Sequence, residues 1–579
     1  MLISAAAFGT VRVYDAARMG LRPDSREDAS VAMRRIIGKM EKEYREGDTV
    51  VLRFREGRYD FHEGSAAERT YYISNHDQTP SKRVGMAFGR IGNLTVDGNG
   101  ARFVFHGRML PVALVQGVNC RLKDFSIDFD KPHIAQVRIV ANDPERGITF
   151  APETWVDWQI TPDSLFVYSG EGWRQQPQCG IVFEPDTRHI VYGTGDVVTP
   201  LHGTYITPDG DVAAPHWRDS RLKAGMVVAL RTYYRPAPAI FVSECRNTVL
   251  ENVSVHYAEG MGLLAQNCED FELDRFNVCL REGDGRYFTT QADATHFSGC
   301  SGRIYSHDGL YEAMMDDAIN VHGTYLKIIG VVDDSTVTAR YMHSQSWGFA
   351  WGAAGETVQF VRSRTMDTAG VMNRIVSIIP ADTNSADGAH EFRIRFAEPL
   401  PDEILNGGKD ENFGIENLTR TPEVAFVRNA VRNNRARGAL FSTPRMVEVV
   451  DNLFDHTSGS AILLCGDCNG WFESGSCRDV TIRRNRFINA LTSRYQFTEA
   501  VISIYPEVPD LARQHDWFHS GIVIEDNEFE SFGTPLLYAK SVDGLIFRRN
   551  RLLTNNDYPA PGDKLSRIRL ERVTNARID

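Results

Sequence analysis

The chain lacks an excess of basic charge. Its 64 lysine and arginine residues stand against 76 acidic ones, a formal net charge of −12. A protein that binds a nucleic-acid backbone needs a basic surface, so this charge balance argues against a nucleic-acid partner. No apolar run approaches the length of a membrane span. The 579 residues are 42% hydrophobic and 24% charged, as in an ordinary globular protein with room for several domains.

Cysteines are few and irregularly spaced. Nine of them at scattered positions do not form the even framework of a disulfide-rich protein. Cys465, Cys468 and Cys477 lie near one another in the sequence, but no second pair accompanies them. We therefore interpret them as packed thiols, with a metal or a disulfide as the alternative. A Gly-rich phosphate loop of the Rossmann or Walker kind is also missing, and we expect no cofactor.

The first twenty residues do not have the pattern of a signal peptide, because no basic region precedes a long apolar block. Two locations follow as expectations. The protein is secreted or periplasmic with a leader absent from this sequence, or it is cytoplasmic. The oligomeric state does not follow from the sequence, and a homodimer stays open.

The sequence does contain internal repeats. Residues 249–255 recur 23 residues later as 272–278, and Cys245 and Cys268 share this offset. In the C-terminal third a short sequence motif with a central asparagine recurs at intervals of 33, 42 and 23 residues. Short strands, turn asparagines and inserted loops are typical of a parallel β-helix, and we predict this all-β fold. We interpret the following asparagines as corners of the coils, not as ligands: Asn434, Asn452, Asn485, Asn527 and Asn550.

Two segments interrupt the coil spacing. They alternate apolar and polar residues between turn residues, which predicts antiparallel, β-barrel-like insertions. Helical spacing over residues 26–45 predicts a short N-terminal cap. The predicted parts are 1–130 (cap and first coils), 131–235 (first insertion), 236–325 (coils with the key aspartates), 326–420 (second insertion) and 421–579 (C-terminal coils).

The strongest functional signal is a set of three aspartates one coil apart. Asp293 lies 23 residues before Asp316 and 24 before Asp317. Stacked coils would bring them together at about the 4.8 Å spacing of neighbouring strands. Clustered carboxylates repel one another, so their pKa values separate into those of an acid and a base. This suits glycoside hydrolysis, with Asp316 as the acid and Asp293 and Asp317 holding the water; inversion ordinarily uses a gap of about 6.5–9.5 Å.

The alternation of inward and outward residues along the following strand refines this prediction. Apolar Ile319 should point into the coil, so Asp316, Asn320 and His322 share the outward face. Asp317 would then point inward, where an unpaired carboxylate is very costly. We therefore expect a bend before the strand that turns both aspartates toward one groove.

Four segments, 285–297, 311–326, 437–444 and 466–475, resemble glycoside hydrolase family 110. The members of that family are exo-acting α-1,3-galactosidases that remove terminal α-galactose with inversion. The resemblance implies a right-handed parallel β-helix with two β-barrel insertions, and it puts the three aspartates above in the matching places. The layout is also similar to that of the polygalacturonase family, but that family's Gly-His-Gly and Arg-x-Lys elements are not evident.

Further residues are candidates for holding a sugar, since sugars bind between aromatic faces and paired polar groups. A Gly-flanked loop supplies an aromatic and an acidic residue, and a second aromatic loop lies in the second insertion. The candidate substrate-binding residues are His296, His322, Asn320, Arg286, Arg437, Trp471, Glu473 and Trp347.

The leading hypothesis is an inverting exo-α-galactosidase acting on glycans that end in α-1,3-linked galactose. Another β-helix enzyme that acts on an acidic polysaccharide, by hydrolysis or as a calcium-dependent lyase, is the second hypothesis. A lyase needs a Lys or Arg base beside calcium-binding carboxylates, and residues 316–321 contain no basic residue. The third hypothesis is a carbohydrate-binding β-helix without enzymatic activity. No metal is required by the leading hypothesis.

Overall fold

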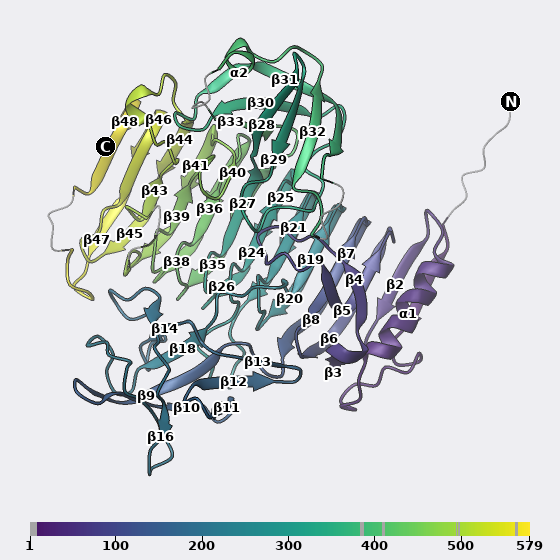
Figure 1. Ribbon diagram of the computed structural model, residues 1–579, viewed down its shortest axis with the longest axis vertical. Coiled ribbons are helices and arrows are strands. Elements are labelled where there is room, and N and C mark those ends of the chain that lie inside the picture. Colours follow the sequence, from purple (N-terminus) through teal and green to yellow (C-terminus); the bar gives the residue numbers. More distant parts are fainter. Residues whose placement is uncertain (1–8, 383–386, 408–411, 494, 496–497, 562–565) are drawn as a thin grey trace.

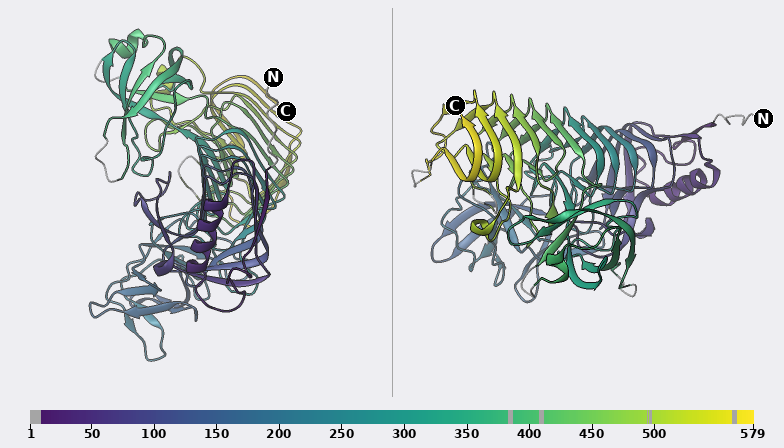
Figure 2. Two further views of the ribbon diagram at one scale, coloured as in Figure 1. Left: turned by 90° about the vertical axis from the view of Figure 1, so that its right-hand side faces the viewer. Right: turned by 90° about the horizontal axis from the view of Figure 1, so that it is seen from above.

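The computed structural model describes residues 9–382, 387–407, 412–493, 495, 498–561 and 566–579. The main body is a parallel β-helix, in which each strand pairs in parallel with the equivalent strand of the next coil. Figure 1 shows the coils stacked from the α1 end to the β48 end, and Figure 2 shows the stack from one end and from above. The predicted fold class, a parallel β-helix with two antiparallel insertions and a helical cap, is confirmed.

Three sheets run along the β-helix. Sheet 1 contains, in order, β5 (Ser81–Gly89), β7 (Leu110–Val115), β19 (Ile240–Ser243), β21 (Leu263–Gln266), β24 (Thr295–Ser298), β27 (Ile319–Thr324), β36 (Ala439–Phe441), β39 (Ile462–Leu464), β43 (Ile502–Ile504) and β46 (Leu537–Arg548). Sheet 2 contains β1 (Val11–Asp15), β2 (Thr49–Arg53), β6 (Leu94–His106), β8 (Val118–Phe129), β20 (Arg246–Val255), β22 (Glu269–Asp274), β25 (Ser301–His307), β34 (Glu423–Val427), β37 (Met446–Val450), β41 (Asp479–Arg483), β44 (His519–Glu525), the second half of β46 and β48 (Ile568–Ile578). Sheet 3 begins with β3 (Gly57–His62) and the ends of β6, β8 and β20, and continues through β23 (Asn277–Val278), β26 (Leu310–Glu312), β35 (Ala430–Arg432), β38 (Leu453–Asp455), β42 (Arg486–Ile488), β45 (Glu528–Ser531) and β47 (Arg551–Thr554).

The repeated asparagines form a ladder between sheets 2 and 3. The side-chain oxygen of Asn452 accepts the backbone N–H of Asn429, and Asn485 does the same for Asn452. Asn527 and Asn550 continue the ladder in the same way. Each buried backbone donor at this corner therefore finds a partner in the next coil, which stabilises the stack.

Asn434, the first of the predicted corners, is not part of this ladder. Its side chain donates to the carbonyl of Arg437, beside the three aspartates. Asn429 takes the first ladder position instead. Inside the helix, Phe454, Phe487 and Phe529 stack on successive coils with ring centroids 5.3 and 4.9 Å apart. All nine cysteines are free, and eight of them are buried.

The first insertion follows β8. Its main sheet has seven antiparallel strands: β15 (Val197–Val198), β14 (Cys179–Phe183), β18 (Val227–Arg231), β9 (Ala135–Asp143), β10 (Gly147–Pro152), β17 (Val212–Ala214) and β16 (Tyr205–Ile206). A small sheet of β11 (Asp157–Ile160), β12 (Phe166–Gly170) and β13 (Trp173–Gln175) accompanies it. In Figure 1 this insertion lies below the β-helix.

The second insertion follows β27 and lies above the β-helix in Figure 1. It is a closed barrel of β28 (Leu326–Asp333), β29 (Thr336–Arg340), β32 (Glu391–Phe396), β31 (Thr368–Pro380), β30 (Thr357–Arg362) and β33 (Phe413–Asn417). The short helix α2 (Asp402–Leu405) follows β32. The predicted domain boundaries stay predictions.

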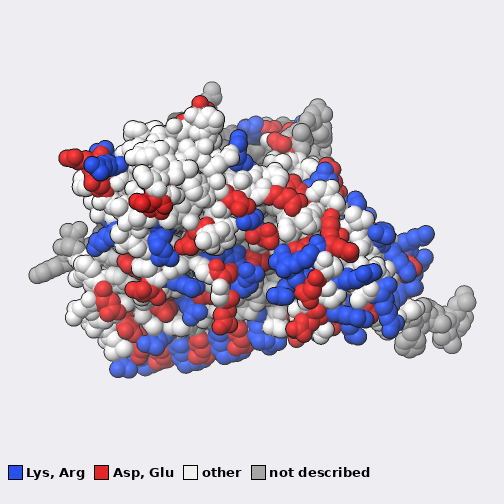
Figure 3. All heavy atoms as spheres, turned by 90° about the horizontal axis from the view of Figure 1, so that it is seen from below, with Lys and Arg blue, Asp and Glu red and all other residues white. Residues whose placement is uncertain are grey.

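The cap helix α1 (Ser30–Glu43) packs at the N-terminal end of the stack. Met33, Ile36, Ile37 and Met40 are buried, and their spacing places them on one face of the helix. On the side of the molecule seen in Figure 3, basic and acidic side chains are interspersed over most of the surface. None of the helices in the described ranges has the length and apolar character that crossing a bilayer requires.

Candidate active site

The three aspartates meet on sheet 1, where the chain enters β24 and β27. Thr295 of β24 pairs with Ile319 of β27, so the same register places Asp293 beside Asp317. The chain bends at Met315 and Asp316 before the strand begins. One oxygen from each of the three carboxylates lies within 4.8 Å of the others. The spacing of the coils in the sequence thus becomes proximity in space.

The cluster lies in a cavity of about 200 Å³. Asp316 is the most accessible of the three, with 25% of its side chain exposed, against 5% for Asp293 and 1% for Asp317. One carboxylate oxygen of Asp316 is buried without a hydrogen-bond partner among the described residues. The cavity is lined by Asn75, Arg235, Met261, Asp293, His296, Asp316, Asp317, Asn320, Arg435, Arg437, Leu440, Cys465, Asp467, Trp471, Glu473 and Tyr495.

Arg437 comes from the next coil and holds the pair of adjacent aspartates. Its backbone N–H donates to one oxygen of Asp317 at 3.0 Å, and its guanidinium donates to the other at 2.7 Å. The same guanidinium lies 3.5 Å from Asp316. Arg435, two residues earlier, lies 4.0 Å from Asp316 and pairs with Asp196 of the first insertion.

Two histidines extend the cluster away from the cavity. His296 contacts Asp293 through Nδ1 at 2.7 Å and His322 through Nε2 at 2.8 Å. Nδ1 of His322 lies 2.5 Å from the carbonyl oxygen of Gly323, so it must donate. If Nε2 of His322 accepts from His296, Nδ1 of His296 accepts a proton held by Asp293; if Nε2 of His322 donates instead, Nδ1 of His296 donates to Asp293. The chain of contacts therefore places one proton between Asp293 and His296.

The ionisation of the three carboxyl groups differs. Burial raises the pKa of Asp293, and the charge of Asp316 raises it further. Burial also raises the pKa of Asp317, although Arg437 opposes this. Burial would raise the pKa of Asp316 as well, but Arg437, Arg435 and other arginines hold it below its ordinary value. We regard Asp317 as ionised in spite of its burial, because two donors of Arg437 contact both of its oxygens.

A loop of the C-terminal coils forms one wall of the cavity. Asp467 accepts the backbone N–H groups of Asn469, Gly470 and Trp471, which shapes the loop. Glu473 follows in β40 (Glu473–Ser474), which pairs antiparallel with the end of β27. This pairing places Glu473 3.4 Å from Nε2 of His322.

The second insertion reaches the same wall. The ring of His343 stacks on Trp471 with centroids 4.3 Å apart. Gln345 accepts the backbone N–H of Asn75 at 2.7 Å and contacts Arg235 through its side chain. The cavity is therefore bordered by the loop that carries Asn75, by Arg235 and by the C-terminal coils, and the second insertion packs behind this wall.

Three predicted substrate-binding residues do not line the cavity. Arg286 is buried in ion pairs with Asp128 and Asp284 and does not line the cavity. Trp347 packs beside His390 in the second insertion, with centroids 4.4 Å apart. His322 lies behind His296 and also does not line the cavity. The structure brings the other predicted residues together, namely His296, Asn320, Arg437, Trp471 and Glu473.

Four residues near the cluster were not predicted from the sequence. Arg435 carried no periodic signal, because it lies in a turn whose next residue, Ala436, has a φ of 65°. Asn75, Asp196 and Arg235 carried none either, since they belong to the loop before β5, the first insertion and the segment that leaves it. Three carboxylates so close are also the donor set of a cation site. The guanidinium groups of Arg437 and Arg435 already supply positive charge there.

Two protein-family models match the chain. GLAA-B beta-barrel domain I matches residues 135–228, within the first insertion, and GLAA-B beta-barrel domain II matches residues 336–408, within the second. Among solved structures, a family 28 exopolygalacturonase from Yersinia enterocolitica aligns with 98% of this chain and 79% of its own at 10% identity. The TM-score of 0.34 is too low to support any argument.

Similar proteins cover the whole chain. An alpha-1,3-galactosidase B of Phocaeicola vulgatus is 57% identical over 100% of this chain and 98% of its own length. One from Bacteroides fragilis is 58% identical over 98% and 96%, and one from Akkermansia muciniphila is 39% identical over 95% and 67%. With the carboxylate cluster, these relatives place the chain among the glycoside hydrolases built on a parallel β-helix. More particularly, the chain belongs to the family of the alpha-1,3-galactosidase B proteins. Its assignment to glycoside hydrolase family 110 stays a prediction.

Proposed function

We propose that the protein is an exo-acting α-galactosidase that hydrolyses terminal α-1,3-linked galactose with inversion. The observation that carries this proposal is the cluster of Asp293, Asp316 and Asp317 in a small cavity. The relatives' names supply the linkage and the sugar. A cavity of about 200 Å³ has room for one terminal sugar rather than for a long chain passing through it.

We assign the role of general acid to Asp316. Its side chain is the most accessible of the three, and the oxygen that does not face Arg437 and Arg435 suits direct contact with the glycosidic oxygen. Asp293 and Asp317 each have an oxygen committed to His296 or Arg437, which suits carboxyl groups that position a water. Asp316 would donate its proton to the leaving oxygen while the water attacks the opposite face of the sugar and gives up a proton to the Asp293–Asp317 pair, which acts as the general base.

Two observations do not support this division of roles. The arginines hold the pKa of Asp316 low, whereas an acid must carry a proton. The 4.8 Å spacing is also shorter than the gap of about 6.5–9.5 Å that inverting pairs ordinarily use. The reversed assignment, with protonated Asp293 as the acid, is favoured by the raised pKa of Asp293 and by the proton it shares with His296.

Leaving-group dependence separates the two assignments. An aryl galactoside with a good leaving group needs little acid assistance, so an acid variant keeps much of its activity on it but loses activity on the α-1,3-linked disaccharide. We expect this behaviour of Asp316→Asn, and we expect Asp293→Asn and Asp317→Asn to lose both activities. If Asp293→Asn alone is spared on the aryl substrate, the roles are reversed.

The reaction and its stereochemistry have separate tests. A panel of α-1,3-, α-1,4- and α-1,6-linked galactosides should show release of galactose from the first. Proton NMR of the fresh product should show β-galactose before mutarotation. If galactose is released from none of the three, the proposed function is wrong; if α-galactose appears first, inversion is wrong.

An acidic-polysaccharide enzyme remains the second hypothesis. A calcium-dependent lyase would lose activity with a chelator and give an unsaturated product that absorbs in the ultraviolet. Neither result is expected, because Arg437 is already bound to the carboxylates that would hold calcium.

A further inference from the structure

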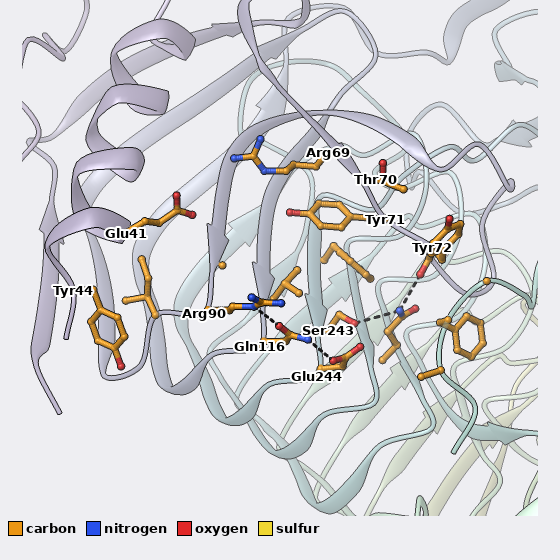
Figure 4. A pocket seen from close by; sticks show the side chains of 18 residues that line it. Glu41, Tyr44, Arg69, Thr70, Tyr71, Tyr72, Arg90, Gln116, Ser243 and Glu244 are labelled. Atoms are coloured by element: carbon orange, nitrogen blue, oxygen red, sulfur yellow. Dashed lines mark hydrogen bonds between the residues drawn. The ribbon is translucent and has the colours of Figure 1, made fainter. Parts of the chain in front are cut away.

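A second hollow, of about 730 Å³, lies on sheet 1 outside the active site (Figure 4). Its floor includes Gly89, Val115, Ser243 and Gln266, which occupy equivalent positions on four successive coils. Two coils further along, the same column of the sheet reaches His322. Because neighbouring strands are about 4.8 Å apart, the coil of Gln266, where this floor ends, lies about 10 Å along the helix axis from the coil of His322.

A loop of residues 71–79, between β4 (Ala67–Thr70) and β5, separates the two cavities. We call this loop the strap. The side chain of Gln266 donates to the carbonyl of Tyr72 at 2.9 Å and accepts the backbone N–H of Ser74 at 3.0 Å. Tyr72 faces the hollow, whereas Asn75, three residues later, lines the active site. The strap is thus a wall between the cavities, and the hollow is a site of its own.

The positive and negative side chains around the hollow are equal in number. Arg69 and Arg90 stand against Glu41 and Glu244. Gln116 links two of them, because it accepts from Arg90 at 2.8 Å and donates to Glu244 at 2.8 Å. Figure 4 shows this row along one side of the hollow. Balanced charge favours a neutral polar ligand over a phosphate or a cation, each of which needs an excess of opposite charge.

Aromatic side chains form the other part of the lining. Tyr71 and Tyr72 come from the strap, Phe241 from sheet 1 and Phe349 from the second insertion. The two phenylalanines are buried, so the tyrosines supply the aromatic surface that a ligand can reach. In Figure 4 the Tyr71 hydroxyl points into the hollow. A pyranose ring combines an apolar face with a rim of hydroxyls, so aromatic faces beside planar polar groups match its chemistry. The volume lies within the range of about 300–1,000 Å³ that is usual for small-molecule sites.

We propose that this hollow is a second carbohydrate-binding site, which holds a neutral oligosaccharide. The inference rests on the proposed function for its ligand class: a glycan with several arms would place one terminal galactose in the active site and another part in the hollow. Binding at two places on one molecule raises the effective concentration of the reacting end. The hollow therefore lowers KM for large branched substrates and leaves small substrates unaffected.

Gly89 offers a way to block the hollow without disturbing the fold. A Cβ atom built there meets only one neighbouring atom, a carboxylate oxygen of Glu41 at 3.9 Å, and the backbone is not in the left-handed region. Gly89→Phe thus fills the hollow with a ring. Gly330→Phe is the matched control, because Gly330 also lies in a strand, has open space around it and belongs to the second insertion.

The test is titration calorimetry in the Asp316→Asn background with neutral hexasaccharides that end in α-1,3-linked galactose. We expect two binding events, one of which disappears in Asp316→Asn/Gly89→Phe but not in Asp316→Asn/Gly330→Phe. In the catalytically intact chain, Gly89→Phe should raise KM for a branched glycan at least fivefold and leave kcat/KM for the disaccharide unchanged.

A single binding event that survives Gly89→Phe would overturn the inference. Tighter binding of an oligogalacturonate of the same length in the hollow would also overturn it, because the ligand would then be acidic. Failure of the wild-type protein to release galactose from any substrate would instead contradict the proposed function, which the binding experiment does not require.

Discussion

Replacing Arg437 with methionine gives a sharp test of how the acidic cluster is held. Arg437 is the closest counter-charge of Asp317, whose side chain is only 1% exposed, and it also lies near Asp316. Removal of one partner from a buried ion pair ordinarily costs about 3–5 kcal/mol, because the other charge is left uncompensated. Asp317 keeps the backbone N–H of residue 437, so we expect the lower end, about 3 kcal/mol at pH 7.

The loss should depend on pH in a defined direction. Without Arg437 the already raised pKa of Asp317 rises further, so the folded variant binds a proton that the unfolded chain releases above about pH 4. The variant is therefore least stable at neutral pH, and its deficit should shrink as the pH falls toward 5. Urea unfolding at pH 7 and pH 5 measures both quantities.

Arg484→Met is the matched control. Arg484 pairs with Asp451 at 2.7 Å, and both side chains are exposed, at 49% and 40%. Such a surface pair contributes at most about 1 kcal/mol. The double variant Asp317→Asn/Arg437→Met should recover most of the stability but none of the activity. A cost below about 1 kcal/mol for Arg437→Met, or an equal cost at both pH values, would refute the reasoning.

Three further predictions concern other parts of the molecule. Trp471→Ala should raise KM roughly 3–10-fold with little change in kcat, since an aromatic contact contributes about 0.5–1.5 kcal/mol. Steady-state kinetics on the disaccharide measures both constants, and a loss confined to kcat would contradict this prediction. Asn485→Ala should cost about 1–3 kcal/mol in urea unfolding because it leaves buried groups of Asn452 and Val449 without partners, and an unchanged midpoint would contradict the ladder. Burial lowers the pKa of His519 to about 3, so the folded protein stays unprotonated where the unfolded chain gains a proton. Stability should therefore fall below pH 6.5 by up to about 1.4 kcal/mol per pH unit, and His519→Gln, measured from pH 7 to 4.5, should show a shallower slope; an equal slope would exclude His519 as the cause.

The sequence was sufficient to predict the β-helix because its information is local and repeated. A coil of about 23 residues recurs, and strands one coil apart pair with that offset, as between Val249 and Glu272. Asparagines at the corners satisfy the backbone of the neighbouring coil. Asn434 also lies at a corner, between β35 and β36, but only the register shows that Asn429, five residues earlier, takes the ladder position.

The partners of single charged or aromatic residues could not be predicted in this way. Arg286 pairs with Asp128, 158 residues earlier in the chain, and this contact directs it away from the cavity. Trp347 packs beside His390 in the second insertion, although neighbouring His343 reaches the active site. Such choices depend on how insertions close over the helix, and no periodicity in the sequence records them.

By itself, the sequence determined that the chain winds into coils and that three aspartates one coil apart lie side by side, because the spacing of stacked strands converts a sequence interval into a distance. Only the tertiary structure decided what surrounds them. Arg437 comes from a coil 120 residues further on, and Asn75 and Asp196 come from the loop before β5 and the first insertion. These contacts join segments that are distant in the chain, and they fix which carboxyl group is paired, which shares a proton and which faces the cavity.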